Sequence, residues 1–155
     1  MKKVKNIAIV TFDSKKTDLI EWSYFNKELL LPHRILALGF AASIIEGTLN
    51  KKIDHLENGK TGGYRQLCNL INEGKIDAVI IFGEANEILE AKDLNAVFEA
   101  AVSHNIIIAG NRTTADFVLY SSLIQAEYTI HTKEKKLSDN EASVTTASAR
   151  LAKAS

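Results

Sequence analysis

Polar residues and glycines of types that can carry chemistry follow the most apolar stretches of this sequence. Carboxylates accept and donate protons, a lysine binds anions, and glycines can expose backbone N–H groups to a ligand. The positions of this kind that come directly after an apolar stretch, or within a turn of it, are Asp13, Lys16, Gly39, Glu84 and Asn111. Their chemistry depends on whether the fold brings them together.

The elements that must position these residues alternate along the chain. Continuous apolar runs predict strands at 6–12, 34–38, 78–82 and 106–109, with a short extended piece at 53–56. Helical spacing of apolar residues predicts helices at 17–30, 41–49, 64–73 and 92–104, and a short helix from Thr114. Such alternation implies a mostly parallel central sheet with helices on both faces. The predicted fold class is α/β, in a three-layer Rossmann-like arrangement.

The carboxyl ends of parallel strands gather at one end of the sheet, and ligands of such folds bind there. We therefore expect a site built from 12–13, 38–39, 82–84 and 110–112, together with residues 59–63 of the loop 57–63. The glycines of that loop permit backbone conformations that are closed to other residues. Backbone N–H groups at Gly39 and at the Gly62-Gly63 helix start could bind an anion.

Composition narrows the function classes. The chain has 155 residues, the length of one domain, with 46% hydrophobic and 25% charged residues. Nineteen basic residues balance nineteen acidic ones, so no net field attracts nucleic acid. The apolar runs are far shorter than the roughly 20 residues that span a bilayer, so we expect no membrane segment. The single Cys68 suits a reducing compartment, and we expect a cytoplasmic protein.

Several common kinds of site have no sequence signal here. The four histidines, at positions 33, 55, 104 and 131, lack the spacing of metal ligands, so we expect no metal site. The sequence contains no G-x-S-x-G, no G-x-G-x-x-G and no Walker-type phosphate loop. Covalent catalysis and nucleotide hydrolysis therefore lack support, and we expect no cofactor.

A set of short segments resembles one known family in its order and spacing. The segments are 7–10 with Asp13 and Lys16, then Gly62-Gly63, then 73–77, and finally Asn111 with 114–117. Over about residues 5–131 the sequence resembles the methylglyoxal synthase family, whose members eliminate phosphate from dihydroxyacetone phosphate. The resemblance implies a domain of this fold over 1–137, a small phosphorylated or anionic metabolite as the ligand, and a homo-oligomer, by resemblance a hexamer.

The C-terminal part of the chain carries weaker signals. Residues 128–132 have the pattern of a last strand. The stretch 138–153 starts with capping-box spacing and ends with basic residues, as a helix dipole favours. Because its apolar face is weak, two interpretations of 138–155 stay open, a C-terminal helix or a frayed tail.

The sequence departs from the family pattern at the positions that carry the family reaction. Tyr64 stands where the family places its catalytic aspartate, directly after the Gly-Gly pair, and Phe12 stands where it places a histidine. The threonine hydroxyls that hold the phosphate are replaced in 38–42, and a further histidine is missing near Glu90 or Ala91. A tyrosine with a pKa of about 10 is a poor proton acceptor at neutral pH, and phenylalanine offers no proton. The pattern therefore predicts a degenerate catalytic site.

Other positions keep the family's residue types, namely Asp13, Lys16, Gly39, Gly59, Gly62, Gly63 and Asp93. In addition, Asn58 replaces a family serine and Glu84 replaces a family aspartate. Lys16 is the most informative, because the resemblance assigns this lysine to the substrate phosphate. The candidate ligand-binding residues are Lys16, Gly39, Asn58, Gly59, Gly62, Gly63 and Tyr64. The candidate carboxylates for proton transfer are Asp13, Glu84 and Asp93. For Asp13 and Asp93 a second interpretation stays open, since each aspartate could only cap a helix.

Three hypotheses about function follow. The first is a family member with a rebuilt site that binds a small phosphorylated or anionic metabolite in a sensing or regulatory role. The second is an active phosphate-eliminating lyase in which Asp13, Glu84 or Asp93 replaces the missing base. The third is a subunit that contributes assembly surface without binding a ligand.

Overall fold

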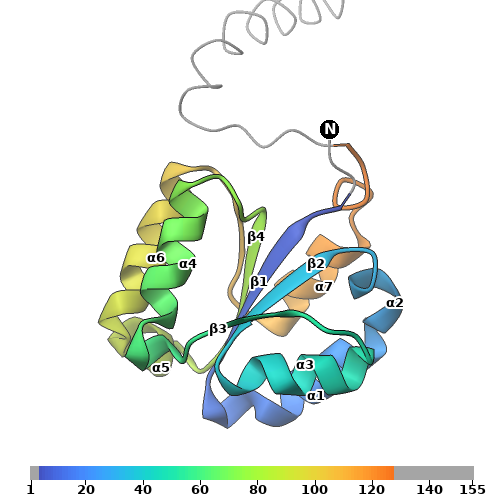
Figure 1. Cartoon of the computed structure of the whole chain (residues 1–155), viewed down its shortest axis with the longest axis horizontal. Helices are drawn as coiled ribbons and strands as arrows, with labels where there is room; N and C mark the ends of the chain where they lie inside the picture. The colour runs from blue at the N-terminus through green and yellow to red at the C-terminus, as the bar shows by residue number, and fades with distance from the viewer. Residues whose placement is uncertain (1–3, 128–155) are drawn as a thin grey trace, which may run out of the picture.

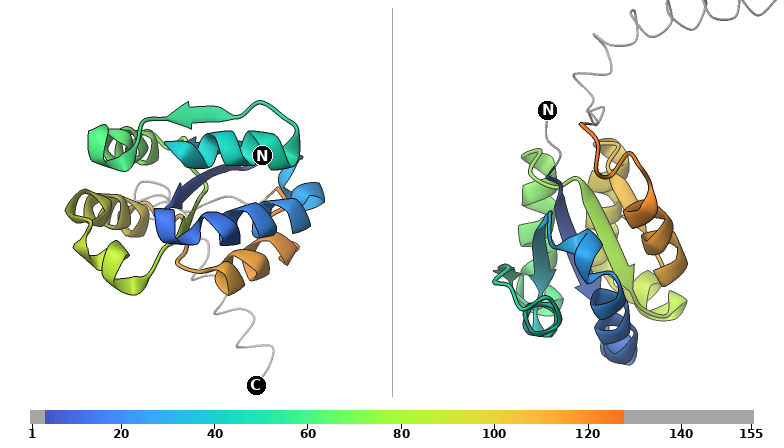
Figure 2. Two further views of the ribbon diagram at one scale, coloured as in Figure 1. Left: turned by 90° about the horizontal axis from the view of Figure 1, so that it is seen from below. Right: turned by 90° about the vertical axis from the view of Figure 1, so that its right-hand side faces the viewer.

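A five-stranded sheet forms the centre of the structure, a computed structural model that describes residues 4–127. The strands are β1 (Asn6–Thr11), β2 (Arg34–Leu38), β3 (Asp54–Leu56), β4 (Ala78–Phe82) and β5 (Ile107–Ala109). Their order in the sheet is β3-β2-β1-β4-β5, and every neighbouring pair is parallel. The arrows of β1 and β4 point the same way in the right-hand view of Figure 2. The α/β fold class predicted from the sequence is confirmed.

Helices cover both faces of the sheet (Figure 1). One face carries α1 (Lys16–Phe25), α3 (Phe40–Leu49) and α7 (Arg112–Tyr120), with the short α2 (Lys27–Leu30) beside them. The other face carries α4 (Gly63–Asn72) and α6 (Lys92–Ser103). The helix α5 (Ala85–Glu90) and the 3-10 turns η1 (Asp13–Lys15) and η2 (Gly59–Thr61) follow β4, β1 and β3. This arrangement leaves the carboxyl ends of the strands to be closed by short turns and helix starts.

The central strand β1 contributes to a separate core on each face. Ile7 and Ile9 pack with α1, α3 and α7, whereas Ala8 and Val10 pack with α4 and α6. All six residues of β1 are buried, because the strand has a neighbour on each side and helices above and below. A strand in this position needs an uninterrupted apolar run, which is the pattern that the sequence has.

The structure divides the predicted helix 17–30 at Asn26. The Asn26 side-chain amide donates hydrogen bonds to the Trp22 carbonyl at 3.0 Å and to Asp116 Oδ1 at 3.2 Å. Asp116 belongs to α7 and also accepts the Trp22 indole N–H at 2.9 Å. The end of α1 is therefore fixed by a contact with a helix that is distant in the sequence.

One helix was not predicted at all. The six residues of α5 start with a capping box, in which Glu84 and Glu87 each accept the other's backbone N–H. None of its residues is buried, so it has no apolar stripe that could have indicated a helix.

No helix in 4–127 is long and apolar enough to cross a membrane. The predictions for 128–132 and 138–155 lie outside the described residues.

Candidate functional site

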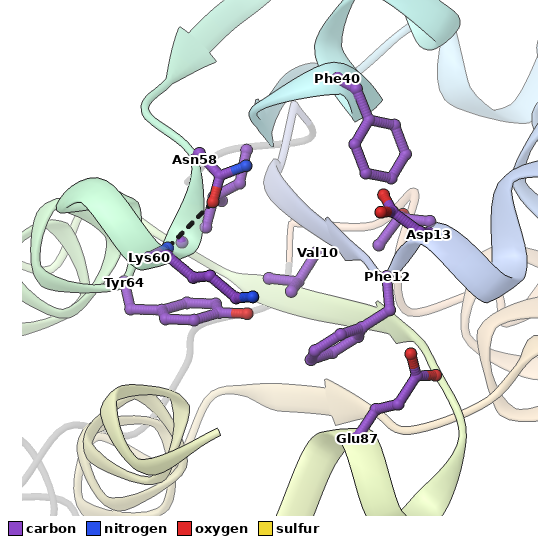
Figure 3. A pocket seen from close by; sticks show the side chains of 11 residues that line it. Val10, Phe12, Asp13, Phe40, Asn58, Lys60, Tyr64 and Glu87 are labelled. Atoms are coloured by element: carbon purple, nitrogen blue, oxygen red, sulfur yellow. Dashed lines mark hydrogen bonds between the residues drawn. The ribbon is translucent and has the colours of Figure 1, made fainter. Parts of the chain in front are cut away.

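A cavity of about 230 Å³ opens at the carboxyl end of the sheet (Figure 3). Its lining comes from residues 10–13 at the end of β1, from Leu38 and Phe40, from residues 58–60, and from Tyr64 and Glu87. These segments follow β1, β2, β3 and β4, as the topology requires for a site at this end of a parallel sheet.

Lys60 supplies positive charge to this cavity. Its side chain extends into the hollow beside the Tyr64 ring in Figure 3. The Lys60 ammonium forms no ion pair with any residue between 4 and 127. The Lys60 backbone N–H donates to Asn58 Oδ1 at 3.0 Å, which fixes the start of the η2 turn. The role of Lys60 was not predicted from the sequence, because one lysine in a glycine-containing loop does not differ in pattern from a solvated surface residue.

The Tyr64 hydroxyl at the cavity can donate a hydrogen bond. Thr11 also lines the cavity, but its hydroxyl is buried and has no hydrogen-bond partner among the described residues. Burial raises the pKa of the Tyr64 phenol, and the negative charge of Asp93 raises it further. Tyr64 is therefore protonated at neutral pH, so it can donate a hydrogen bond but cannot act as the base.

The glycines of the predicted site hold its loops together. Gly39 has a left-handed φ of 56°, and its N–H donates to the Leu56 carbonyl at 3.1 Å. The Gly63 N–H donates to the Asn58 carbonyl at 2.9 Å. These two N–H groups, which the sequence analysis offered to an anion, are thus engaged within the protein. Phe40 begins α3 without a side-chain cap and lines the cavity, so the amino end of that helix lies beside the cavity.

The positions of Gly59 and Gly62 are also sterically restricted. A Cβ on Gly59 would overlap the Tyr64 ring. Gly62 adopts a φ of 122°, and a Cβ there would lie 2.9 Å from the Glu57 carboxylate. Both glycines therefore let the loop 57–63 fold closely enough to present Lys60 and Tyr64 to the cavity.

The three candidate carboxylates lie in different surroundings. Asp13 lines the cavity, and its carboxylate lies below the Phe40 ring in Figure 3. Glu84 instead forms a salt bridge with Lys15, in which Glu84 Oε1 lies 2.8 Å from Lys15 Nζ, and its side chain also caps α5. That hydrogen-bonded pair raises the pKa of Lys15. Asp93 lines a neighbouring cavity. The structure thus brings Asp13 to the first cavity and not the other two.

Glu87 is a carboxylate at the cavity that sequence analysis missed. Its Oε1 accepts the Ser14 hydroxyl at 2.6 Å and the Glu84 backbone N–H at 2.9 Å. These two hydrogen bonds lower the pKa of Glu87, so it stays ionised and is held in place. The signal that could have found it is the spacing from Glu84 to Glu87, which fits a capping box.

Lys16 flanks the cavity without lining it. Its Nζ lies 4.7 Å from the centroid of the Phe40 ring and 4.0 Å from Asp13 Oδ1. The Lys16 side chain is 52% exposed, so it can move without disturbing the core.

A second cavity of about 490 Å³ adjoins the first beside α4 and α6. It shares Gly59, Lys60 and Tyr64 with the first cavity and adds Arg65 and Asp93 to the lining. Tyr64 therefore stands where the two cavities meet. No group of three or more His, Cys, Asp or Glu side chains in the described range could hold a metal ion.

An all-parallel three-layer domain with a cavity at the carboxyl end of its sheet belongs to the broad class of Rossmann-like α/β proteins. The chain is 36% identical over 124 residues to methylglyoxal synthase of Photorhabdus laumondii, which covers 79% of this chain and 82% of that protein. It is 34% identical over 134 residues to methylglyoxal synthase of Erwinia tasmaniensis, covering 86% and 88%.

Comparison with a solved structure indicates the same family as the two sequence relatives. The crystal structure of methylglyoxal synthase from Elizabethkingia anophelis matches with a TM-score of 0.77 and 30% sequence identity, over 88% of this chain and 91% of that one. No family model matches the sequence. The chain belongs to the methylglyoxal synthase family.

Proposed function

We propose that this family member binds a small phosphorylated or otherwise anionic metabolite in the cavity at the carboxyl end of its sheet. The observation that carries the proposal is the Lys60 ammonium, which extends into the cavity and has no ion-pair partner in 4–127. The start of α3 at Phe40 adds the positive end of a helix dipole. Tyr64 adds a hydroxyl donor for ligand oxygens.

We further propose that the ordinary reaction of the family does not proceed in this site. Phe12 and Tyr64 both line the cavity, at the positions that the resemblance assigns to a histidine and to the catalytic aspartate. The raised pKa of Tyr64 keeps its phenol protonated. Loss of one acid or base residue costs about 10²- to 10⁴-fold in rate, and here two positions have changed together.

Calorimetric titration with dihydroxyacetone phosphate and with inorganic phosphate tests the binding proposal. Lys60→Gln should weaken binding about tenfold or more, since a charge-assisted hydrogen bond to phosphate is lost. The matched control is Lys75→Gln, which removes an exposed lysine that pairs with Glu73 and lines neither cavity. Equal affinities for Lys60→Gln and the wild-type protein, or no binding of either compound, would contradict the proposal.

A second candidate function is an active lyase that uses Asp13 as its base. Asp13 favours it, because this aspartate is the one candidate carboxylate of the three that lines the first cavity. Methylglyoxal formation from dihydroxyacetone phosphate should then exceed the background and disappear in Asp13→Asn and in Lys16→Ala. Formation at the background rate in all three proteins would leave the binding function.

We also propose that the chain forms a homo-oligomer, by family resemblance a hexamer. Large aromatic side chains support this, because Phe25 on α1 and Phe117 on α7 are 72% and 76% exposed. Light scattering coupled to size-exclusion chromatography measures the mass directly, and a monomer at micromolar concentration would refute the proposal.

A further inference from the structure

Apolar side chains form much of the lining of the first cavity, the one of about 230 Å³ at the carboxyl end of the sheet. Val10 on β1 and Leu38 on β2 are buried, whereas three aromatic side chains of the lining are only partly buried. The three are Phe12, Phe40 and Tyr64. A free phosphate ion at Lys60 would leave these apolar surfaces in contact with water, so an anion alone does not account for them.

Two of the rings lie directly against glycines. A Cβ on Gly83 would come within 2.6 Å of the Phe12 ring, and a Cβ on Gly59 would overlap the Tyr64 ring. Both rings also pack against the core on the α4 and α6 side of the sheet. In Figure 3 they extend toward each other, Tyr64 from α4 and Phe12 from the end of β1. The lack of a side chain at Gly59 and Gly83 thus lets both rings lie at the cavity.

Phe12 and Tyr64 have ring surface to offer to a ligand. Neither forms a ring-to-ring or cation-to-ring contact with any residue in 4–127. Phe40 differs, because Lys16 Nζ lies 4.7 Å from the centroid of its ring. Phe12 and Tyr64 are therefore the two rings that we expect a ligand to contact.

The charges at the cavity indicate where the anionic group of a ligand would lie. Glu87 already accepts two hydrogen bonds from neighbouring residues. Asp13 Oδ1 lies 4.0 Å from Lys16 Nζ, and the Asp13 side chain is 85% exposed to solvent. Lys60 has no ion-pair partner in the described range, and it extends beside the Tyr64 ring in Figure 3. An anionic group at Lys60 thus places the rest of the ligand next to the aromatic rings.

A polar ligand tail and an aromatic one differ in how they fit this lining. The hydroxyl and carbonyl groups of a triose would lose hydrogen bonds to water against Val10, Phe12 and Leu38, whose side chains offer none in return. An aromatic ring is favoured by leaving water, and it meets other rings in offset or edge-to-face contacts. The cavity volume of about 230 Å³ is below the roughly 300–1,000 Å³ of sites for drug-sized ligands, which leaves room for one ring.

We propose that the ligand of this cavity is a phosphate monoester of a single aromatic ring. The phosphate pairs with Lys60 and accepts a hydrogen bond from the Tyr64 hydroxyl, and the ligand ring packs against Phe12 and the Tyr64 ring. This selectivity rests on the anion site of the proposed function and specifies the class of metabolite that the site takes.

Calorimetric titrations with two phosphate monoesters of similar size test this selectivity. Phenyl phosphate carries the aromatic ring, and glycerol phosphate carries a polar tail on the same anionic group. Phenyl phosphate should bind about tenfold more tightly, because its ring leaves water and contacts two protein rings.

Three variants locate the selectivity at the ring of Phe12. Phe12→Ala should weaken phenyl phosphate binding about tenfold and leave glycerol phosphate binding unchanged. Phe12→Leu keeps an apolar side chain in the core contact, and it should weaken phenyl phosphate binding about threefold. Tyr120→Ala removes a ring that is 70% exposed and lines neither cavity at this end of the sheet, so it should change neither affinity.

Each contrary result has its own meaning. Equal affinities for phenyl phosphate and glycerol phosphate would overturn the aromatic selectivity and leave the anion site of the proposed function standing. No binding of either compound would refute the anion site, and the selectivity with it. A preference for phenyl phosphate that is as large in Phe12→Ala as in the wild-type protein would show that the ligand ring does not contact Phe12. If circular dichroism shows Phe12→Ala to be unfolded, an unchanged preference in Phe12→Leu would have the same meaning.

Discussion

Substitution of Gly63 by alanine is a sensitive test of how the site loop is held. Gly63 is the first residue of α4, and its N–H donates to the Asn58 carbonyl at 2.9 Å. A Cβ at this position would overlap the Glu57 carbonyl oxygen and come within 2.9 Å of the Asn58 carbonyl oxygen. Both neighbours are backbone atoms, which cannot rotate away as a side chain can. The loop 57–63 must therefore move if alanine is accommodated.

The magnitude follows from the hydrogen bonds that such a movement breaks. The Asn58 carbonyl accepts the N–H groups of Thr61 and Gly63, at 3.0 and 2.9 Å. Each bond contributes about 1 kcal/mol to stability, so Gly63→Ala should lower the free energy of unfolding by about 2 kcal/mol. For a chain of this length that corresponds to a fall in melting temperature of roughly 4–8 °C.

Urea unfolding followed by circular dichroism measures this change, and Gly47→Ala is the matched control. Gly47 lies inside α3, and a Cβ there meets nothing within 4 Å. Alanine has the better helix propensity, so Gly47→Ala should stabilise the protein by about 0.5–1 kcal/mol. One chemical change should therefore have opposite signs at two glycines.

Unchanged stability in Gly63→Ala would refute this reasoning. It would mean that the loop 57–63 can retreat from α4 without losing its hydrogen bonds. A loss of stability in Gly47→Ala as large as that in Gly63→Ala would refute it as well, since the steric argument would then not distinguish the two positions.

Two further predictions concern buried polar groups. The lowered pKa of His33 means that the unfolded chain binds a proton at this ring more readily than the folded chain does. The stability that neutral His33 contributes is therefore complete above about pH 6.5. This contribution is lost as the pH falls from about 6.5 toward the lower pKa that His33 has in the folded state. Between about pH 7 and 5 the urea midpoint of His33→Asn should therefore fall less steeply than that of the wild-type protein. Asp116→Ala should cost about 1–3 kcal/mol, because it leaves the Trp22 indole N–H without its acceptor. Tryptophan fluorescence during unfolding measures that loss, and a stability equal to wild type would contradict it.

Much of the fold could be predicted because its signals are local. The apolar runs of β1 and β4 indicate strands buried on both faces, and both are buried along their whole length. The helix α6 was predicted at 92–104 and spans Lys92–Ser103, since Leu94, Val97 and Ala101 repeat on one face. The break at Asn26 could not be predicted, because it depends on Asp116, a partner ninety positions away.

The candidate site was harder to predict than the fold. The resemblance directed attention to Lys16 and to glycines, and the structure gives those glycines mainly a steric role. The cation that lines the cavity is Lys60, whose position depends on how the η2 turn folds against α4. The sequence also could not predict that the Thr11 hydroxyl lacks a hydrogen-bond partner among the described residues, since a missing hydrogen bond is a property of the packed structure.

The central place of β1 in the sheet also affects how the chain is made. β1 leaves the ribosome before the other strands of this sheet, and one of its edges pairs with β2 soon afterwards. Its other edge pairs with β4, which is not synthesised until residues 78–82. At a synthesis rate of ~5–20 residues per second, that apolar edge waits roughly 4 to 14 s for its partner. The nascent chain therefore exposes an unpaired apolar edge, which favours aggregation, until β4 has been made.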